Sequence, residues 1–212
     1  MVNIILNFQR ESGKILTYLY SLIIAFSLTT IITVLLTDGL YTIRSPLQIP
    51  IYMLLIFFSF LVTLIPFYHG AVIFLVKSYD TEQKNLKKGE FLFDFCFLLI
   101  ESLVFFAMAL SSSYVIGFIQ WLIILFGIDI MWAFICYIKA SDKKHAPPKY
   151  WGILNFITLI ILLLYLLFSV YENLSQTNAL CLLFLILFVR SIVDYRYSYD
   201  YYFGIFKESF PG

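Results

Sequence analysis

The chain has 212 residues, of which 62% are hydrophobic and 13% are charged, and its mean hydropathy is +0.92. Soluble domains are roughly 45–50% apolar and about 25% charged, so this composition excludes a soluble protein and indicates an integral membrane protein. The net charge is +1 and the basic residues sit in short loops, not in a continuous patch. We therefore expect no direct binding of nucleic acid.

Six hydrophobic stretches follow one another along the chain, each near the roughly 20 residues that cross a hydrocarbon core of about 30 Å. They cover residues 16–36, 49–76, 91–110, 114–138, 150–170 and 179–193. Residues 1–15 form a polar cytoplasmic lead-in without the features of a signal peptide, and residues 194–212 form an aromatic-rich tail. The predicted fold class is an all-α integral membrane protein, a six-transmembrane-helix bundle over residues 16–193 with a short interfacial C-terminal segment.

The basic residues indicate the orientation of these spans. With a cytoplasmic N-terminus, six spans bring both termini and 13 of the 14 Lys and Arg residues to the cytoplasmic side, and leave only Arg44 outside. An odd number of spans would scatter the lysines over both faces. We therefore predict that both termini are cytoplasmic and that the protein lies in the cell (inner) membrane.

The stretch over residues 49–76 is longer than a perpendicular span needs, and it contains Pro66, which removes a backbone hydrogen bond and tends to kink a helix. Ser59, Thr63, Pro66 and Gly70 recur at spacings of 4, 3 and 4, and so share one helical face of small or polar groups. Two interpretations stay open. This face packs on a neighbouring helix, or the kink at Pro66 and Gly70 serves gating or lines a water-filled cavity.

Six ionisable residues fall within the predicted spans or at their ends: His69, Asp94, Glu101, Asp129, Arg190 and Asp194. Helical residues rise about 1.5 Å each, which places Asp94 just inside the cytoplasmic boundary and the deeper members of this set roughly 12–18 Å from it. A charge in hydrocarbon costs at least about 2.5–3.5 kcal/mol, so these side chains should face the bundle interior and pair with one another. Arg190 and Asp194 form an i,i+4 pair, and Arg190 can also reach the depth of Glu101 and Asp129.

Three interpretations of this polar set stay open. The first is a buried ion-pair network that holds the helices together. The second rests on the excess of acids over Arg190, with His69 able to titrate near neutral pH: an acidic vestibule for cation or proton movement, or a proton relay. The third is a lipid or small-molecule pocket.

No catalytic motif accompanies these groups. The sequence contains no G-x-S-x-G elbow, no H-E-x-x-H pair and no glycine-rich phosphate loop, so we do not expect an enzyme. Cys96, Cys136 and Cys181 lie inside predicted spans, and no close spacing of Cys and His indicates a metal site. We expect neither a metal nor a cofactor.

The tail is rich in tyrosine. On a helix, Tyr195, Tyr199, Tyr202 and Phe203 share a face with Phe206 that is suited to lying in the membrane interface. This face predicts anchoring at the headgroups. Docking of a cytoplasmic partner or of a neighbouring subunit is the alternative.

Two hypotheses of function follow. The first is an oligomeric cation or proton channel or transporter, in which the acids and His69 line the path and Arg190 is the counter-charge. The second is a non-transporting membrane anchor or sensor subunit that recruits a soluble cytoplasmic protein in a microbial multi-component system. In both, the partners are the lipid bilayer and further copies of the chain, because small residues allow close helix contact at Ala107, Ser111, Ser113 and Gly117.

Overall fold

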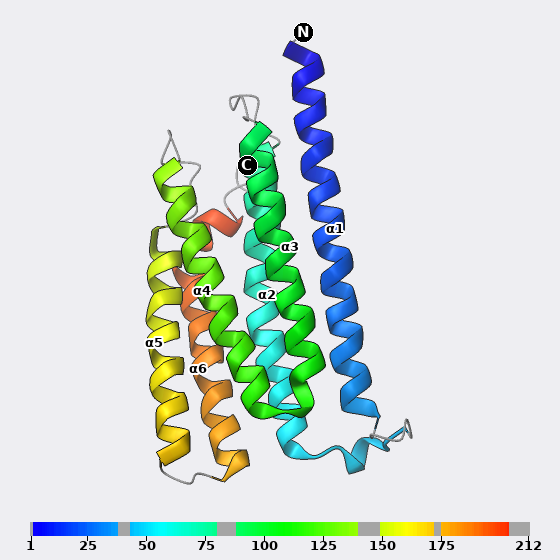
Figure 1. Ribbon diagram of the computed structural model, residues 1–212, viewed down its shortest axis with the longest axis vertical. Helices are drawn as coiled ribbons and strands as arrows, with labels where there is room; N and C mark the ends of the chain where they lie inside the picture. The colour runs from blue at the N-terminus through cyan, green and yellow to red at the C-terminus, as the bar shows by residue number, and fades with distance from the viewer. Residues whose placement is uncertain (1, 38–42, 80–87, 140–148, 172–174, 204–212) are drawn as a thin grey trace, which may run out of the picture.

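The computed structural model describes residues 2–37, 43–79, 88–139, 149–171 and 175–203. This part of the chain is almost entirely helical (Figure 1). The six long helices are α1 (Val2–Leu36), α2 (Ile51–Tyr79), α3 (Lys88–Leu110), α4 (Val115–Lys139), α5 (Lys149–Tyr171) and α6 (Gln176–Tyr197). Two short 3-10 turns, η1 (Pro46–Gln48) and η2 (Ser111–Ser113), precede α2 and α4. Within the described ranges the β pairing is limited to one bridge between Thr37 and Ile43.

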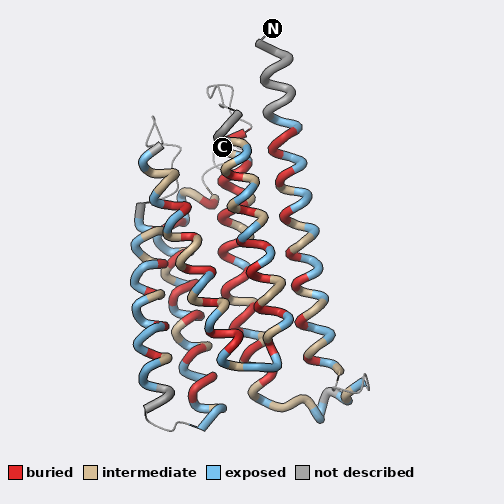
Figure 2. The backbone as a smooth tube through the Cα atoms, viewed as in Figure 1, coloured by how far each residue is buried: buried red, intermediate tan, exposed pale blue. Residues whose placement is uncertain are grey.

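All six helices are long and apolar enough to cross a membrane, which confirms the six predicted spans and a polytopic membrane protein. Large apolar side chains remain exposed along the outer sides of the bundle, as expected where lipid is the solvent. Figure 2 shows the same division, with buried residues gathered toward the middle of the bundle. The membrane concerned and the orientation of the termini stay predictions.

The N-terminal stretch is helical. α1 is continuous from Val2, so residues 2–15 are the first turns of the helix, and their place outside the membrane stays a prediction. This stretch contains no proline, and its one glycine, Gly13, does not interrupt the helix. Gly13 instead lets α1 approach α2 closely, because a Cβ atom there would lie 2.6 Å from the Cβ atom of Tyr79.

The six helices form a closed ring. α1 packs on α3 and α2, α3 packs on α4, α4 on α5, α5 on α6, and α6 on α2, which completes the circuit. α5 packs chiefly on α4, and α6 packs chiefly on α2. The contact between α5 and α6 is therefore less extensive than the contact of either helix with its other neighbour, and we call it the looser seam of the ring. In Figure 1, α3 and α4 lie in front of α2 and α6.

Aromatic side chains fill the middle of this ring. Phe67 of α2 makes edge-to-face contacts with Phe105 of α3 and Phe126 of α4, with ring centroids 5.8 and 5.6 Å apart. Phe60 meets Phe105 in the same way at 5.9 Å. All four side chains are at most 1% exposed. We call these four residues the aromatic plug.

The face of small and polar residues on α2 is buried along its length. Ser59, Thr63, Pro66 and Gly70 are all buried, and α2 runs through Pro66 as one helix. Gly70 lies so close to Trp151 of α5 that a Cβ atom at this position would overlap the indole ring. The interpretation of this face as a packing surface fits this arrangement, whereas the gating role of the kink stays a prediction.

The tail folds back and does not extend α6 as an interfacial helix. α6 ends at Tyr197, and the backbone N–H of Ser198 donates to the carbonyl of Asp194. Residues 199–203 then form a short helical turn that runs from the end of α6 toward α2 (Figure 1). Tyr202 is consequently fully buried, while Tyr199 is exposed. Anchoring of the tail in the membrane interface stays a prediction. Residues 204–212, with Phe206, lie outside the described part of the chain.

Candidate functional site

The charged side chains of the six helices, in the part that the structure describes, all lie in one half of the bundle. This is the half in which α1 begins and α6 ends, and we call it the charged half. The helix segments of the other half contain only neutral side chains within the described ranges. Any chemistry of ionisable groups therefore belongs to the charged half.

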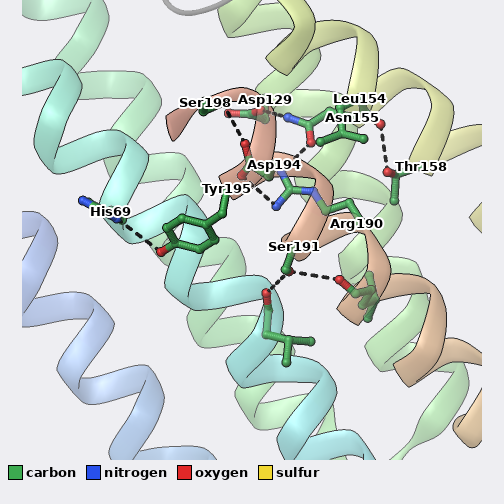
Figure 3. A network of polar contacts seen from close by, with 12 residues as sticks. His69, Asp129, Leu154, Asn155, Thr158, Arg190, Ser191, Asp194, Tyr195 and Ser198 are labelled. Carbon is green, nitrogen blue, oxygen red and sulfur yellow. Dashed lines mark hydrogen bonds and ion pairs between the residues drawn. The ribbon is translucent and has the colours of Figure 1, made fainter. Parts of the chain in front are cut away.

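Arg190 of α6 lies at the centre of a polar network (Figure 3). Its Nη1 atom lies 3.3 Å from Oδ2 of Asp194, and its Nη2 atom donates to Oδ1 of Asn155 on α5 over 2.7 Å. Asn155 in turn donates a hydrogen bond to Asp129 on α4. All four residues are at most 4% exposed. Arg190 is thus joined to Asp194 directly and to Asp129 through Asn155.

The guanidinium group of Arg190 also contacts the aromatic plug. Its Cζ atom lies 4.9 Å from the ring centroid of Phe67 and 5.5 Å from that of Phe126, which are cation–π distances. Among the described residues, Arg190 is the one buried lysine or arginine, and its Nε atom has no hydrogen-bond partner. Arg190 therefore connects Asp129 and Asp194 with the aromatic plug.

The network continues through Asp194 into the tail. The Tyr202 hydroxyl lies 3.2 Å from each carboxylate oxygen of Asp194, and the Ser198 hydroxyl donates to the same carboxylate. The Tyr202 ring stacks on His69 of α2 with a centroid distance of 4.7 Å, and Nδ1 of His69 lies 3.2 Å from the Tyr195 hydroxyl. Burial, together with the neighbouring Asp194 carboxylate, raises the pKa of Tyr202 above its usual range. Its phenol therefore stays a proton donor to Asp194.

Lys77 of α2 holds the same tail turn. Its Nζ atom donates to the carbonyl oxygen of Tyr201 over 2.8 Å and lies 3.9 Å from the centroid of the Tyr201 ring. Burial raises the pKa of the Tyr201 phenol as well. The tail turn is thus attached to α2 at its backbone and at two aromatic rings.

A second polar cluster lies between α1, α2 and α3. The Tyr20 hydroxyl donates to Oε1 of Glu101 over 2.6 Å, and the Tyr20 ring stacks on Tyr68 at a centroid distance of 5.9 Å. The Tyr68 hydroxyl lies 2.8 Å from that of Ser21. Glu101 faces the interior, as expected, but its described partner is a tyrosine and not Arg190.

Asp94 has a tyrosine donor too. Tyr79, at the end of α2, donates to Oδ2 of Asp94 over 3.0 Å, and both residues are buried. Tyrosine hydroxyls therefore hydrogen-bond three of the buried carboxyl groups of the charged half, on Asp94, Glu101 and Asp194. The Asn155 amide bonds the fourth, on Asp129.

Among the predicted polar residues, only Glu101 and Asp94 have described hydrogen bonds apart from the network around Arg190. The structure joins Asp129, Arg190 and Asp194, whereas His69 lies against the tail tyrosines and Asp94 against Tyr79. The partners that sequence reasoning missed are Tyr20, Tyr79 and Asn155. Depth alone gave no signal for the pair of Tyr20 and Glu101, because the predicted first span begins at residue 16 and places Tyr20 nearer the boundary than Glu101.

Two grooves with mainly apolar linings accompany the network. One of about 220 Å³ lies between α5 and α6, and one of about 170 Å³ lies between α1 and α3. Neither is lined by Glu101 or Asp129. Over the ranges that the structure describes, no three His, Cys, Asp or Glu side chains are grouped to hold a metal ion.

Comparison of the chain with known protein families, with curated proteins and with solved structures finds no match. The function must be inferred from the chemistry of the site.

Proposed function

We propose that this protein moves protons across the membrane along the axis of the helix ring. The observation that supports this function is a surplus of buried acid: Glu101, Asp129 and Asp194 share the interior with one guanidinium, that of Arg190. A charged carboxylate in a low-dielectric interior is so costly that it takes up a proton when no cation balances it. A buried site with surplus carboxylates is therefore suited to bind and release protons.

A proton fits this site better than a larger cation. A larger cation needs a cavity lined by oxygen ligands, whereas the described partners of Glu101 and Asp129 are the hydrogen-bond donors Tyr20 and Asn155. A proton can pass between a hydroxyl and a carboxyl group that are hydrogen-bonded, such as those of Tyr20 and Glu101.

The aromatic plug serves as the gate of this proposed path. Phe67 and Phe126 contact the Arg190 guanidinium and follow directly beyond the acids along the ring axis. Apolar constrictions close a path by excluding water. Beyond the plug the ring interior contains hydroxyl groups, and that of Ser59 is buried without a hydrogen-bond partner in the described part of the chain. Water that enters after the plug moves would find a donor and acceptor there.

Proton flux into liposomes tests the proposal. The purified protein is reconstituted with a pH-sensitive dye inside, and a potassium diffusion potential drives proton entry. We expect flux with the wild-type protein, and a fall to the rate of protein-free liposomes in Glu101→Gln and Asp129→Asn. Glu11→Gln, an exposed acid paired with Lys14, is the matched control and should conduct normally. Absence of flux in the wild-type protein, or full flux in both acid variants, would contradict the proposal.

The plug offers a separate test in the same liposomes. Phe67→Ala removes the ring that contacts both Phe105 and Phe126, so we expect faster proton entry than in the wild-type protein. Phe58→Ala, on an exposed position of the same helix, is the control. Equal rates of proton entry in the two variants would show that the aromatic plug is not the gate.

The confinement of charge to one half of the bundle favours a second candidate, the non-transporting sensor. In this alternative, proton uptake at Asp194 loosens Tyr202 and releases the tail turn for a soluble partner. A fluorophore at Tyr199→Cys, in a protein without its other cysteines, would report the release as a change of emission on acidification. Loss of that change in Asp194→Asn, in a protein without proton flux, would support this candidate over the first.

A further inference from the structure

The groove between α5 and α6 is an opening in the looser seam of the ring. Its lining includes Tyr150, Ile153 and Ile157 of α5 and Val193 and Tyr197 of α6. All of these except Val193 are also exposed on the outer surface. The groove is therefore accessible from the side of the bundle that faces the hydrocarbon of the bilayer.

The groove lies at the end of two membrane spans. The span of α5 begins at Tyr150 and that of α6 ends at Tyr197, and the rings of these two tyrosines lie 6.1 Å apart at the rim. Tyrosine is enriched at the level of the lipid headgroups, where its ring is apolar and its hydroxyl is wet. This end of the groove therefore lies where phospholipid chains join their ester groups.

Polar groups lie at the same end of the groove. Trp151, Asp194 and Ser198 belong to its lining and are at most 2% exposed. The indole N–H of Trp151 is buried and has no hydrogen-bond partner among the described residues. These buried side chains close the inner wall of the groove, and the part of the groove that stays open is apolar.

We propose that this groove binds a membrane phospholipid, with an acyl chain between α5 and α6 and the ester groups at the level of Tyr150 and Tyr197. The volume of about 220 Å³ is below the roughly 300–1,000 Å³ of sites that enclose whole small molecules, so it suits a chain segment. The bilayer is the source of such chains on this face. This inference does not depend on proton movement.

Fluorescence quenching by phosphatidylcholine with brominated acyl chains tests the site. Trp121→Phe and Trp132→Phe leave Trp151 as the one tryptophan, and its side chain is too buried for contact with bulk lipid. We expect strong quenching in nanodiscs of the brominated lipid. Val193→Phe fills the groove and should abolish the quenching, whereas Ile192→Phe, exposed beside it on α6, should leave it intact.

A second measurement covers the case in which the single-tryptophan protein does not fold. Mass spectrometry of the protein with all its tryptophans, released from detergent micelles, should show a retained phospholipid that Val193→Phe loses and Ile192→Phe keeps. Equal quenching in the two variants, no quenching of Trp151, or equal lipid retention in the two variants would overturn the inference.

Discussion

Arg190 is the residue on which the buried charges depend. It forms the one described ion pair of the interior, with Asp194, reaches Asp129 through Asn155, and lies on the rings of Phe67 and Phe126. Removing one partner of a buried pair leaves the other charge uncompensated, which costs more than the pair itself contributes.

We therefore predict that Arg190→Met lowers the free energy of unfolding by about 3–5 kcal/mol, the usual loss when a buried pair is broken. Adding Asp194→Asn should recover part of this loss, because it removes the stranded charge and retains an acceptor for Tyr202. Chemical unfolding in detergent micelles measures both variants. A double variant as unstable as Arg190→Met would contradict the explanation. Lys14→Gln, which breaks an exposed pair, should cost no more than about 1 kcal/mol.

The Tyr202 phenol makes the free energy of unfolding depend on pH in the alkaline range. Burial and Asp194 raise the pKa of its phenol in the folded protein, whereas the unfolded value is about 10. Below about pH 10 both states keep the proton and stability is unaffected. Above it the unfolded chain loses a proton that the folded protein retains, so stability falls as the pH rises.

We predict that Tyr202→Phe makes this alkaline fall of stability less steep, although the variant is less stable at neutral pH because it lacks the hydrogen bonds to Asp194. Unfolding temperatures between about pH 9 and pH 12 test this, since the linked protons are those of a phenol. Tyr199→Phe, at an exposed position, should follow the wild-type curve. Parallel curves for all three proteins would show that the Tyr202 phenol titrates normally.

Depth along the helices predicted the residues of the site, but not which of them meet. Helical rise gives the level of Glu101 or Arg190 in the membrane, and the cost of a buried charge predicts that both face inward. The choice of partner depends on how the helices are rotated and ordered around the ring. Glu101 on α3 meets Tyr20 because α3 packs on α1, whereas Arg190 on α6 meets Asn155 on the neighbouring α5.

At the scale of single helices, α2 shows how small residues decide the packing. Because Gly70 has no side chain, the Trp151 ring of α5 can pack against the backbone of α2. α6 packs on both of these helices. Gly127 of α4 has no neighbour within 4 Å of the position of a Cβ atom. The two glycines therefore have opposite consequences when replaced.

We predict that Gly70→Ala destabilises the protein by about 1–3 kcal/mol, as overpacking does in other interiors. Gly127→Ala should be neutral or stabilise by up to about 1 kcal/mol, because alanine favours the helix. Thermal unfolding of the two variants in the same detergent is the measurement. An unchanged unfolding temperature in Gly70→Ala would mean that Trp151 is displaced easily.

The tail illustrates what an apolar periodicity leaves out. A helix through residues 195–206 would place Tyr195, Tyr199 and Tyr202 on one outer face. Ser198 ends α6 instead, and the turn brings Tyr202 onto His69 and Asp194. Buried Asp194 needs a donor, and Tyr202 supplies one, which a pattern of apolar residues does not reveal.

At the scale of the whole molecule, six antiparallel spans bring the beginning of α1 and the end of α6 to one side of the bundle. Among the basic residues that the structure describes, Arg44 alone lies at the opposite end, in the connection before α2. The distribution of basic residues predicted this division, since loops with Lys and Arg stay in the cytoplasm.

Labelling of single cysteines with a membrane-impermeant maleimide in whole cells tests the orientation. In a protein without its native cysteines, Leu47→Cys, at a position 99% exposed, should react on intact cells. Glu11→Cys and Tyr199→Cys should react only after permeabilisation, because the charged half faces the cytoplasm in the predicted orientation. Reaction of Glu11→Cys on intact cells would reverse the orientation. In that case the surplus acid of the charged half would meet protons from the outer side, and the proposed path would open inward through the aromatic plug.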